Sequence, residues 1–84
     1  MSENIIWTTK HCPFCEKAKQ MMDNREIKYE TRLVGGEDGW TLDNLLTYAP
    51  DAKTFPQVWV EGKHIGGCDD LEAYFAIGEM GLDL

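Results

Sequence analysis

The sequence predicts a small α/β domain in which a four-stranded mixed sheet carries three helices on its two faces, in the order β-α-β-α-β-β-α. The chain has 84 residues, enough for one domain, residues 1–84, and too few for two. Its apolar residues alternate between strand-like and helix-like spacing along the chain. A strand–helix–strand start implies a parallel strand pair, and a hairpin near the end adds antiparallel strands.

The first third of the chain is expected to form a strand, a helix and a second strand. Residues 5–8 are apolar and rich in β-branched side chains, as strands are. From residue 13 to about residue 24, apolar side chains recur at helical spacing, and Pro13 suits the first turn, where its missing N–H costs nothing. Residues 27–33 alternate and predict the second strand. The expected buried stripe of this first helix comprises Phe14, Cys15, Ala18, Met21 and Met22.

The middle of the chain is expected to form a helix and a hairpin. Thr41 can cap a helix that Pro50 ends. Residues 55–60 lead into a third strand, and residues 61–63 form a tight turn before a short return strand, residues 64–66. The expected apolar face of the capped helix comprises Leu42, Leu45 and Leu46.

A third helix is expected near the end of the chain. Asp69 offers an N-cap, Glu72 is its expected capping-box partner three residues later, and Gly78 weakens the helix. The inward stripe is expected to comprise Leu71, Tyr74, Phe75 and Ile77.

Composition and charge exclude several classes of protein. Hydrophobic residues make up 43% and charged residues 27%, an ordinary balance for a folded domain. There are 15 acidic and 8 basic residues, a formal net charge of −7, which argues against a nucleic-acid partner. No apolar stretch is long enough to span a membrane, and the N-terminus lacks the regions of a secretory signal. We therefore expect a cytoplasmic protein, in whose reducing environment closely spaced cysteines serve catalysis or metal binding.

The strongest motif is His11-Cys12-Pro13-Phe14-Cys15, at the junction of the first strand and the first helix. Cys12 is expected at the helix cap, where unpaired N–H groups and the helix dipole favour a thiolate. Lys10 adds positive charge nearby. Cys15 lies one step inside the helix and is expected to be more buried. This placement predicts that Cys12 attacks a substrate disulfide and that Cys15 then resolves the mixed disulfide.

Two other interpretations of the cysteine pair are possible. Half of a zinc site would need further ligands from Cys68, His11 and His64, but the sequence has no second Cys-x-x-Cys pair, so no metal site is expected. Two inert core cysteines would leave the proline between them unexplained. The two histidines are expected to be surface residues.

Two weaker motifs follow. Thr54-Phe55-Pro56 precedes a strand, where a proline is ordinary. The run from Gly66 to Asp70 is a glycine turn that opens a helix, and the free N–H groups of such a turn bind carboxylates or phosphates. Taken alone, each has a plain structural interpretation as a strand start or a helix cap.

Together and in this order, the three segments resemble those of glutaredoxins, the small glutathione-linked members of the thioredoxin-like fold. The resemblance covers essentially the whole chain. Cys12-Pro13-Phe14-Cys15 resembles the dithiol motif of the family, and Thr54-Phe55-Pro56 resembles its Thr-Val-Pro. Residues 66–71 resemble its Gly-Gly-x-x-Asp region. The combination is specific, whereas each segment alone is not.

The resemblance implies roles for individual residues. Cys12 would be the nucleophile and Cys15 the resolving thiol, and the two would form the redox-active disulfide. Pro56 would be cis and would turn the backbone of Phe55 toward the nucleophile. The start of the last helix would take the γ-glutamyl end of glutathione. The implied glutathione-binding residues are Lys10, Cys12, Phe14, Thr54, Phe55, Pro56, Gly67, Cys68, Asp69 and Asp70.

Three departures from the family pattern matter. The second helix has neither the Gln nor the Arg that similar proteins place near the glycine carboxylate of glutathione, so Lys10 or Lys53 would substitute. Phe55 stands where the family has valine and would narrow the groove. Cys68 is either a small packed residue or a regulatory thiol.

The resemblance implies a monomeric, glutathione-dependent dithiol–disulfide oxidoreductase with glutathione as co-substrate and no bound metal or nucleotide. Its partners would be disulfide-containing or glutathionylated proteins, with ribonucleotide reductase as one candidate. Alternatives are a thioredoxin-like electron donor recharged by a flavoprotein reductase, against which the Gly-Gly-x-x-Asp segment argues, and an iron–sulfur cluster carrier. A non-catalytic binding module is a further alternative.

Overall fold

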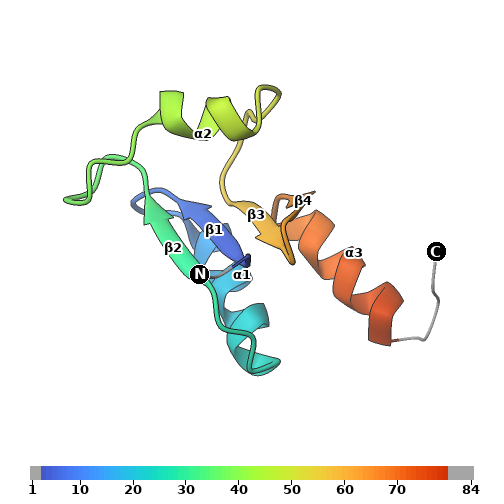
Figure 1. Ribbon diagram of the computed structural model, residues 1–84. Coiled ribbons are helices and arrows are strands. Elements are labelled where there is room, and N and C mark those ends of the chain that lie inside the picture. Colours follow the sequence, from blue (N-terminus) through green and yellow to red (C-terminus); the bar gives the residue numbers. More distant parts are fainter. Residues whose placement is uncertain (1–2, 80–84) are drawn as a thin grey trace.

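A computed structural model describes residues 3–79, and its elements follow the predicted order (Figure 1). Within this range, no helix is long and apolar enough to cross a bilayer. The elements are β1 (Ile5–Thr8), α1 (Pro13–Asn24), β2 (Glu30–Leu33), α2 (Leu42–Tyr48), β3 (Gln57–Val60), β4 (Lys63–Gly66) and α3 (Cys68–Glu79).

The four strands form one mixed sheet in the order β2-β1-β3-β4. β1 runs parallel to β2 and antiparallel to β3, and β3 and β4 form an antiparallel hairpin. At the hairpin turn, Glu61 and Gly62 both have positive φ, 53° and 80°. Positive φ at both central residues is what a two-residue type I′ turn requires. The predicted thioredoxin-like arrangement is confirmed.

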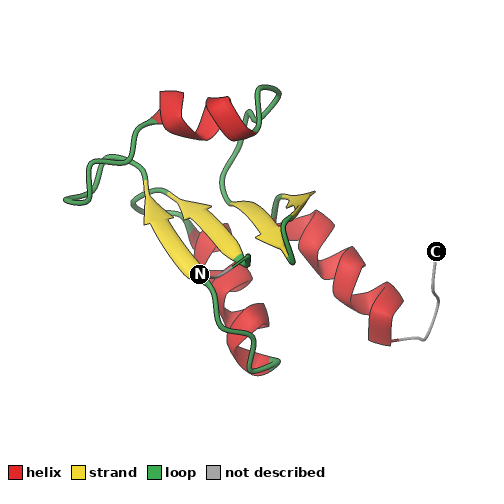
Figure 2. Cartoon of the chain, in the orientation of Figure 1, coloured by secondary structure: helices red, strands yellow, loops and turns green. Residues whose placement is uncertain are grey.

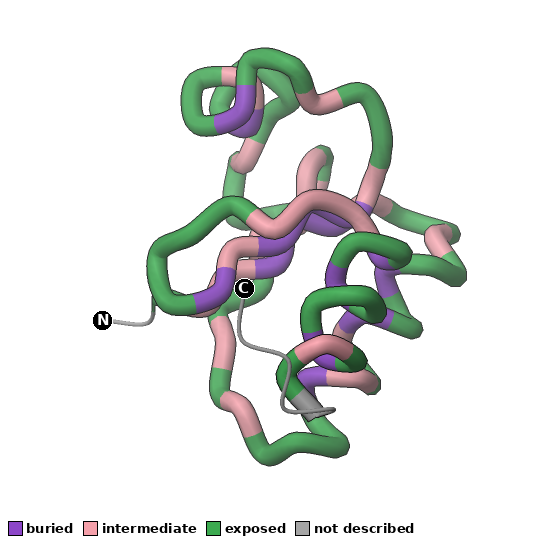
Figure 3. The backbone as a smooth tube through the Cα atoms, turned by 90° about the vertical axis from the view of Figure 1, so that its right-hand side faces the viewer, coloured by how far each residue is buried: buried purple, intermediate pink, exposed green. Residues whose placement is uncertain are grey.

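The two faces of the sheet carry separate apolar clusters, because successive side chains of a strand point to opposite faces. On one face, Ile6 and Val58 pack against α1 and α3; on the other, Trp7 packs against α2. Figure 2 shows α2 on the opposite side of the strands from α1 and α3. Figure 3 shows the buried segments along the strands and on the inner sides of the helices. The predicted placement of helices on both faces is therefore correct.

β2 is shorter than predicted and begins at Glu30 rather than Ile27. The Ile27 N–H donates to the Met22 carbonyl at 3.0 Å, so this residue still belongs to the turn that ends α1. Ile27 and Tyr29 both pack against the core cluster beneath α1 and α3. Their alternation thus reflects packing of a connecting segment and not pairing in the sheet.

The start of α3 differs from the predicted capping pattern. The Gly67 carbonyl accepts the first helical hydrogen bond, from the Leu71 N–H at 3.0 Å. The Asp70 carboxylate reaches back and accepts from the Gly67 N–H at 3.1 Å. The predicted N-cap at Asp69, with Glu72 as its capping-box partner, is therefore wrong. The N-cap lies two residues earlier, at Gly67, whose N–H donates to Asp70.

The apolar stripes of the helices are narrower than predicted. Phe14, Leu42 and Tyr74, all expected on inward faces, are 60%, 51% and 39% exposed. Each lies at the margin of its stripe, where the helix surface turns toward solvent. The stripe positions that remain buried include Cys15, Leu45 and Phe75.

Candidate active site

Cys12 is the N-cap of α1, as predicted, and has an extended backbone. Its carbonyl accepts hydrogen bonds from the N–H groups of Cys15 and Glu16 at 3.1 and 3.2 Å. Its Sγ also accepts from the Cys15 N–H, at 3.2 Å. Pro13 follows in the first turn, where no N–H is needed. Sulfur at this position faces the Cys15 N–H and the positive end of the helix dipole, which together stabilise a thiolate.

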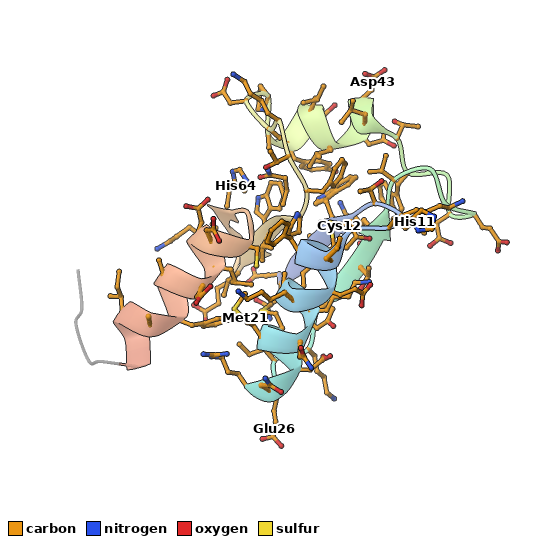
Figure 4. All side chains as sticks on the ribbon, turned by 180° about the vertical axis from the view of Figure 1, so that it is seen from behind. His11, Cys12, Met21, Glu26, Asp43 and His64 are labelled. Atoms are coloured by element: carbon orange, nitrogen blue, oxygen red, sulfur yellow. A yellow bond between two sulfur atoms is a disulfide. The ribbon has the colours of Figure 1, made fainter. Side chains whose placement is uncertain are left out.

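Cys12 and Cys15 are joined by a disulfide, with their Cα atoms 5.2 Å apart. That separation is ordinary for a disulfide. Cys15 is only 1% exposed, whereas Cys12 is partly exposed at the end of the helix. The predicted difference in burial between the two sulfur-bearing residues is present. In Figure 4, Cys12 lies at the start of α1 and His11 in the loop that precedes it.

A cleft of about 490 Å³ is bounded by the start of α1, the segment before β3, the end of β4 and the start of α3. Its volume is in the range of small-molecule sites. The residues that line it are Phe14, Asp51, Ala52, Lys53, Thr54, Phe55, Gln57, His64, Gly66, Gly67, Cys68, Asp69 and Asp70.

Most of the predicted glutathione-binding residues meet in this cleft. Three of them, Lys10, Cys12 and Pro56, do not belong to the lining within the described part of the chain. Lys10 is exposed in the loop before α1, and the Pro56 side chain is fully buried. The predicted residues that do line the cleft are Phe14, Thr54, Phe55, Gly67, Cys68, Asp69 and Asp70.

The start of α3 lies close to the segment before β3. The peptide bond between Phe55 and Pro56 is cis, as the resemblance implied. A Cβ atom on Gly67 would lie 3.5 Å from the Pro56 carbonyl oxygen. Gly66 has φ +124°, and a Cβ atom there would lie 2.9 Å from Cγ of Asp70. The contact at Gly67 would be an ordinary van der Waals distance, whereas a side chain at Gly66 would have to displace the Asp70 carboxylate.

The charges around the cleft are of both signs. Asp69 and Asp70 lie in the first turn of α3. Asp51 and Lys53 come from the segment between α2 and β3. The cleft therefore offers N–H donors and a lysine to anionic groups, and carboxylates to a cationic group.

Cys68 is a free thiol that is 5% exposed at the start of α3. Burial raises its pKa, although the charge of Lys17 acts in the opposite direction. Lys17 is held by Glu72 through an ion pair of 3.3 Å, and this hydrogen bond raises the pKa of Lys17. A buried thiol with a raised pKa stays protonated at neutral pH, as expected for a packed residue rather than a reactive one.

Several residues of the cleft were not expected there. Asp51 and Ala52 have no distinctive local pattern, whereas Gly66 belongs to the predicted glycine turn before α3. Gln57 does carry a signal, since it is a polar residue inside the apolar run that forms β3. His64 was expected simply at the surface. It is exposed, but it also lines the cleft and lies close to Gln57.

The ligands that a zinc site would need are not brought together. Among residues 3–79, no group of three or more His, Cys, Asp and Glu side chains is arranged to hold a metal ion.

A family model described as glutaredoxin matches residues 4–65. The chain belongs to the glutaredoxin family. It is 40% identical over 74 residues to glutaredoxin-C8 of Oryza sativa, covering 83% of this chain and 54% of that protein. It is 32% identical over 76 residues to a glutaredoxin of Pseudomonas aeruginosa, covering 90% and 88%. The chain thus spans just over half the length of this rice protein and of glutaredoxin-C4 of Arabidopsis thaliana.

A solved structure supports the same family. The fold superimposes on a buckwheat glutaredoxin, crystallised as a complex with glutathione, with a TM-score of 0.76 and 27% identity. The match covers 94% of this chain and 73% of the buckwheat chain. The predicted family and its thioredoxin-like fold are confirmed.

Proposed function

We propose that this protein is a glutathione-dependent dithiol–disulfide oxidoreductase that reduces protein disulfides and glutathione mixed disulfides. The observation that carries the proposal is the placement of Cys12 at the cap of α1 with Cys15 buried behind it. In the reduced protein, the helix cap is expected to stabilise the Cys12 sulfur as an anion, and Cys15 lies within bonding reach.

Reduction of a protein disulfide proceeds in two exchanges. The Cys12 thiolate attacks one sulfur of the substrate disulfide, which forms a mixed disulfide and releases the other substrate sulfur as a thiolate. Cys15, after losing its proton, then attacks Sγ of Cys12. The second substrate sulfur leaves, and the protein retains the Cys12–Cys15 disulfide. The short path between the two sulfur atoms makes the second exchange intramolecular and fast.

Two molecules of glutathione regenerate the dithiol. The first attacks Sγ of Cys12 and releases Cys15, and the second attacks the bound glutathione sulfur, which releases glutathione disulfide and the Cys12 thiolate. The cleft suits this co-substrate, because glutathione has two carboxylates and one ammonium group at neutral pH. The free N–H groups of α3 and Lys53 suit the carboxylates, and Asp69 or Asp70 suits the ammonium.

The substrates are proposed at the level of chemistry. Any exposed protein disulfide or glutathionylated cysteine that reaches Cys12 can react, and the disulfide of ribonucleotide reductase is one candidate. The protein is proposed to act as a monomer in the cytoplasm, where glutathione is abundant and reduced.

Single serine substitutions test the division of labour. We expect Cys12→Ser to abolish both reactions. Cys15→Ser should lose reduction of protein disulfides but keep removal of glutathione from a glutathionylated peptide, because that reaction needs one thiol. Lys63→Gln is the control, since this exposed residue lies outside both the disulfide and the cleft lining. Equal loss of deglutathionylation in the Cys12 and Cys15 variants would contradict the assignment.

The source of electrons is tested with the oxidised protein. We expect reduced glutathione to restore the dithiol and a thioredoxin reductase with NADPH not to do so. The opposite result would identify a thioredoxin-like electron donor. A brown colour with visible absorption in protein purified without oxygen would identify an iron–sulfur carrier.

A further inference from the structure

Gln57 is a buried polar residue whose amide is bonded at both ends. It is 5% exposed and lies at the start of β3, next to the fully buried Pro56 and Val58. Its Nε2 donates to the Thr54 carbonyl at 2.8 Å. Its Oε1 lies 2.8 Å from Nε2 of His64. Leaving such an amide unpaired in the interior would be costly, so both contacts hold it in place.

The chemistry of the three groups sets the direction of this chain of hydrogen bonds. The Thr54 carbonyl can only accept, so the NH₂ end of the Gln57 amide must face it. The amide oxygen therefore faces His64, and Nε2 of His64 must carry a proton. This nitrogen is protonated both in the charged ring and in one neutral tautomer. The hydrogen bonds therefore run from His64 through Gln57 to Thr54, with each group donating to the next.

His64 is itself held by the hairpin. Its ring stacks on Trp59, with ring centroids 4.3 Å apart and an angle of 22° between the planes. The two residues are partners across β3 and β4, directly before a β-bulge that shifts the register, so that Gly66 pairs with Val58. Bulges commonly redirect side chains beside functional sites. Figure 4 labels His64 on β4.

This series of hydrogen bonds ends at Thr54, on the segment before β3 that is proposed to bind glutathione. Thr54 and Phe55 line the cleft together with Gln57 and His64. A hydrogen bond to the Thr54 carbonyl fixes the backbone immediately before Phe55, whose peptide groups are expected to pair with the cysteinyl part of glutathione. The anchor of that backbone is thus a side chain on β3 that is oriented by a side chain on β4.

We propose that Gln57 and His64 are positioning residues that hold the Thr54–Phe55 backbone in the geometry that binds the glutathionyl group. The proposal rests on the proposed function. Neither side chain takes part in sulfur exchange. Their loss is therefore expected to weaken binding of the glutathionyl group and to leave the exchange step at Cys12 unchanged.

Steady-state kinetics with a glutathionylated peptide and saturating reduced glutathione test the proposal. We expect His64→Phe, which keeps the aromatic stack but loses the donor, to raise KM for the peptide about fivefold, the effect of one hydrogen bond. Gln57→Met should raise it at least as much, and kcat should change less than twofold in both. Lys63→Gln, an exposed neighbour outside the cleft lining, is the control with unchanged KM.

A spectroscopic measurement keeps the test independent of folding losses in the variants. We expect ¹⁵N NMR of the wild-type protein to show neutral His64 as the Nε2–H tautomer. The Nδ1–H tautomer in the wild type, or an unchanged KM in both variants, would overturn the proposal while wild-type turnover keeps the proposed function. Absence of glutathione-dependent turnover by the wild type would overturn both.

Discussion

Replacing Gly66 by alanine is expected to destabilise the protein and to disturb the cleft at the same time. Gly66 has φ +124°, a region that L side chains rarely adopt, and forcing another residue into such a region costs about 1–3 kcal/mol. The added Cβ would also lie 2.9 Å from Cγ and 3.1 Å from Cβ of Asp70, so that side chain must move. Moving this exposed side chain gives up its hydrogen bond from the Gly67 N–H, which costs about 1 kcal/mol more. We expect the free energy of unfolding to fall by roughly 2–4 kcal/mol in total.

Urea denaturation of the oxidised protein measures this loss. Gly62→Ala is the matched control, because Gly62 has φ +80° and no atom lies within 4 Å of an added Cβ, so only the backbone cost of about 1 kcal/mol applies. Adding Asp70→Ala to Gly66→Ala should cost less than Asp70→Ala costs alone, because the hydrogen bond from the Gly67 N–H is already lost. If Gly66→Ala costs no more than Gly62→Ala, the reasoning about close approach at the start of α3 is wrong.

Three further predictions concern the same helix. Asp70→Ala should raise KM for glutathione several-fold and change kcat less. Asp70→Asn can still accept from the Gly67 N–H and should therefore keep more of the stability. Equal KM values for Asp70→Ala and the wild type would show that Asp70 is not part of the site. Burial raises the pKa of Cys68, so as pH rises the thiol loses its proton in the unfolded chain before it does so in the folded protein. The free energy of unfolding of the oxidised protein should therefore fall as pH rises above about 8.5, the ordinary thiol pKa. Urea titrations at neutral and alkaline pH check this, and Cys68→Ala should flatten the dependence. Gly78→Ala should stabilise the protein by about 0.5–1 kcal/mol in the same assay, because the residue is helical and an added Cβ meets open space.

The features that the sequence predicts well are those set by local chemistry. Cys12 at the cap and Pro13 in the first turn are adjacent in the chain, and helix capping depends on neighbours within a few residues. Thr41 is confirmed as the N-cap of α2 in the same way. Its side chain accepts from the Asn44 N–H at 3.1 Å, and the Asn44 side chain accepts from the Thr41 N–H at 2.9 Å.

The features that the sequence does not predict depend on contacts between distant segments. The alternation over Ile27 and Tyr29 is typical of a strand, but these side chains pack against the core cluster beneath α1 and α3. Periodicity alone does not distinguish a strand from such a packed connecting segment. The N-cap of α3 is not the predicted Asp69, because the Asp70 carboxylate accepts from the Gly67 N–H. The sequence fits this arrangement and the Asp69–Glu72 capping box equally well.

The supporting part of the cleft was the least predictable. Gln57 and His64 come together through the hairpin register and its bulge, neither of which is encoded in a local motif. The family resemblance names residues near the substrate, and it does not describe the hydrogen bonds that hold them.

Ionisation of Cys12 in the reduced protein is the measurement that tests the central claim most directly. The N–H of Cys15 and the positive end of α1 are expected to stabilise the thiolate by about 1–2 kcal/mol, roughly a tenfold gain in ionisation. The thiolate absorbance of a Cys15→Ser/Cys68→Ser variant, followed against pH, reports on Cys12 alone. We predict a pKa of Cys12 well below that of free cysteine. A pKa equal to or above that of free cysteine would contradict the account.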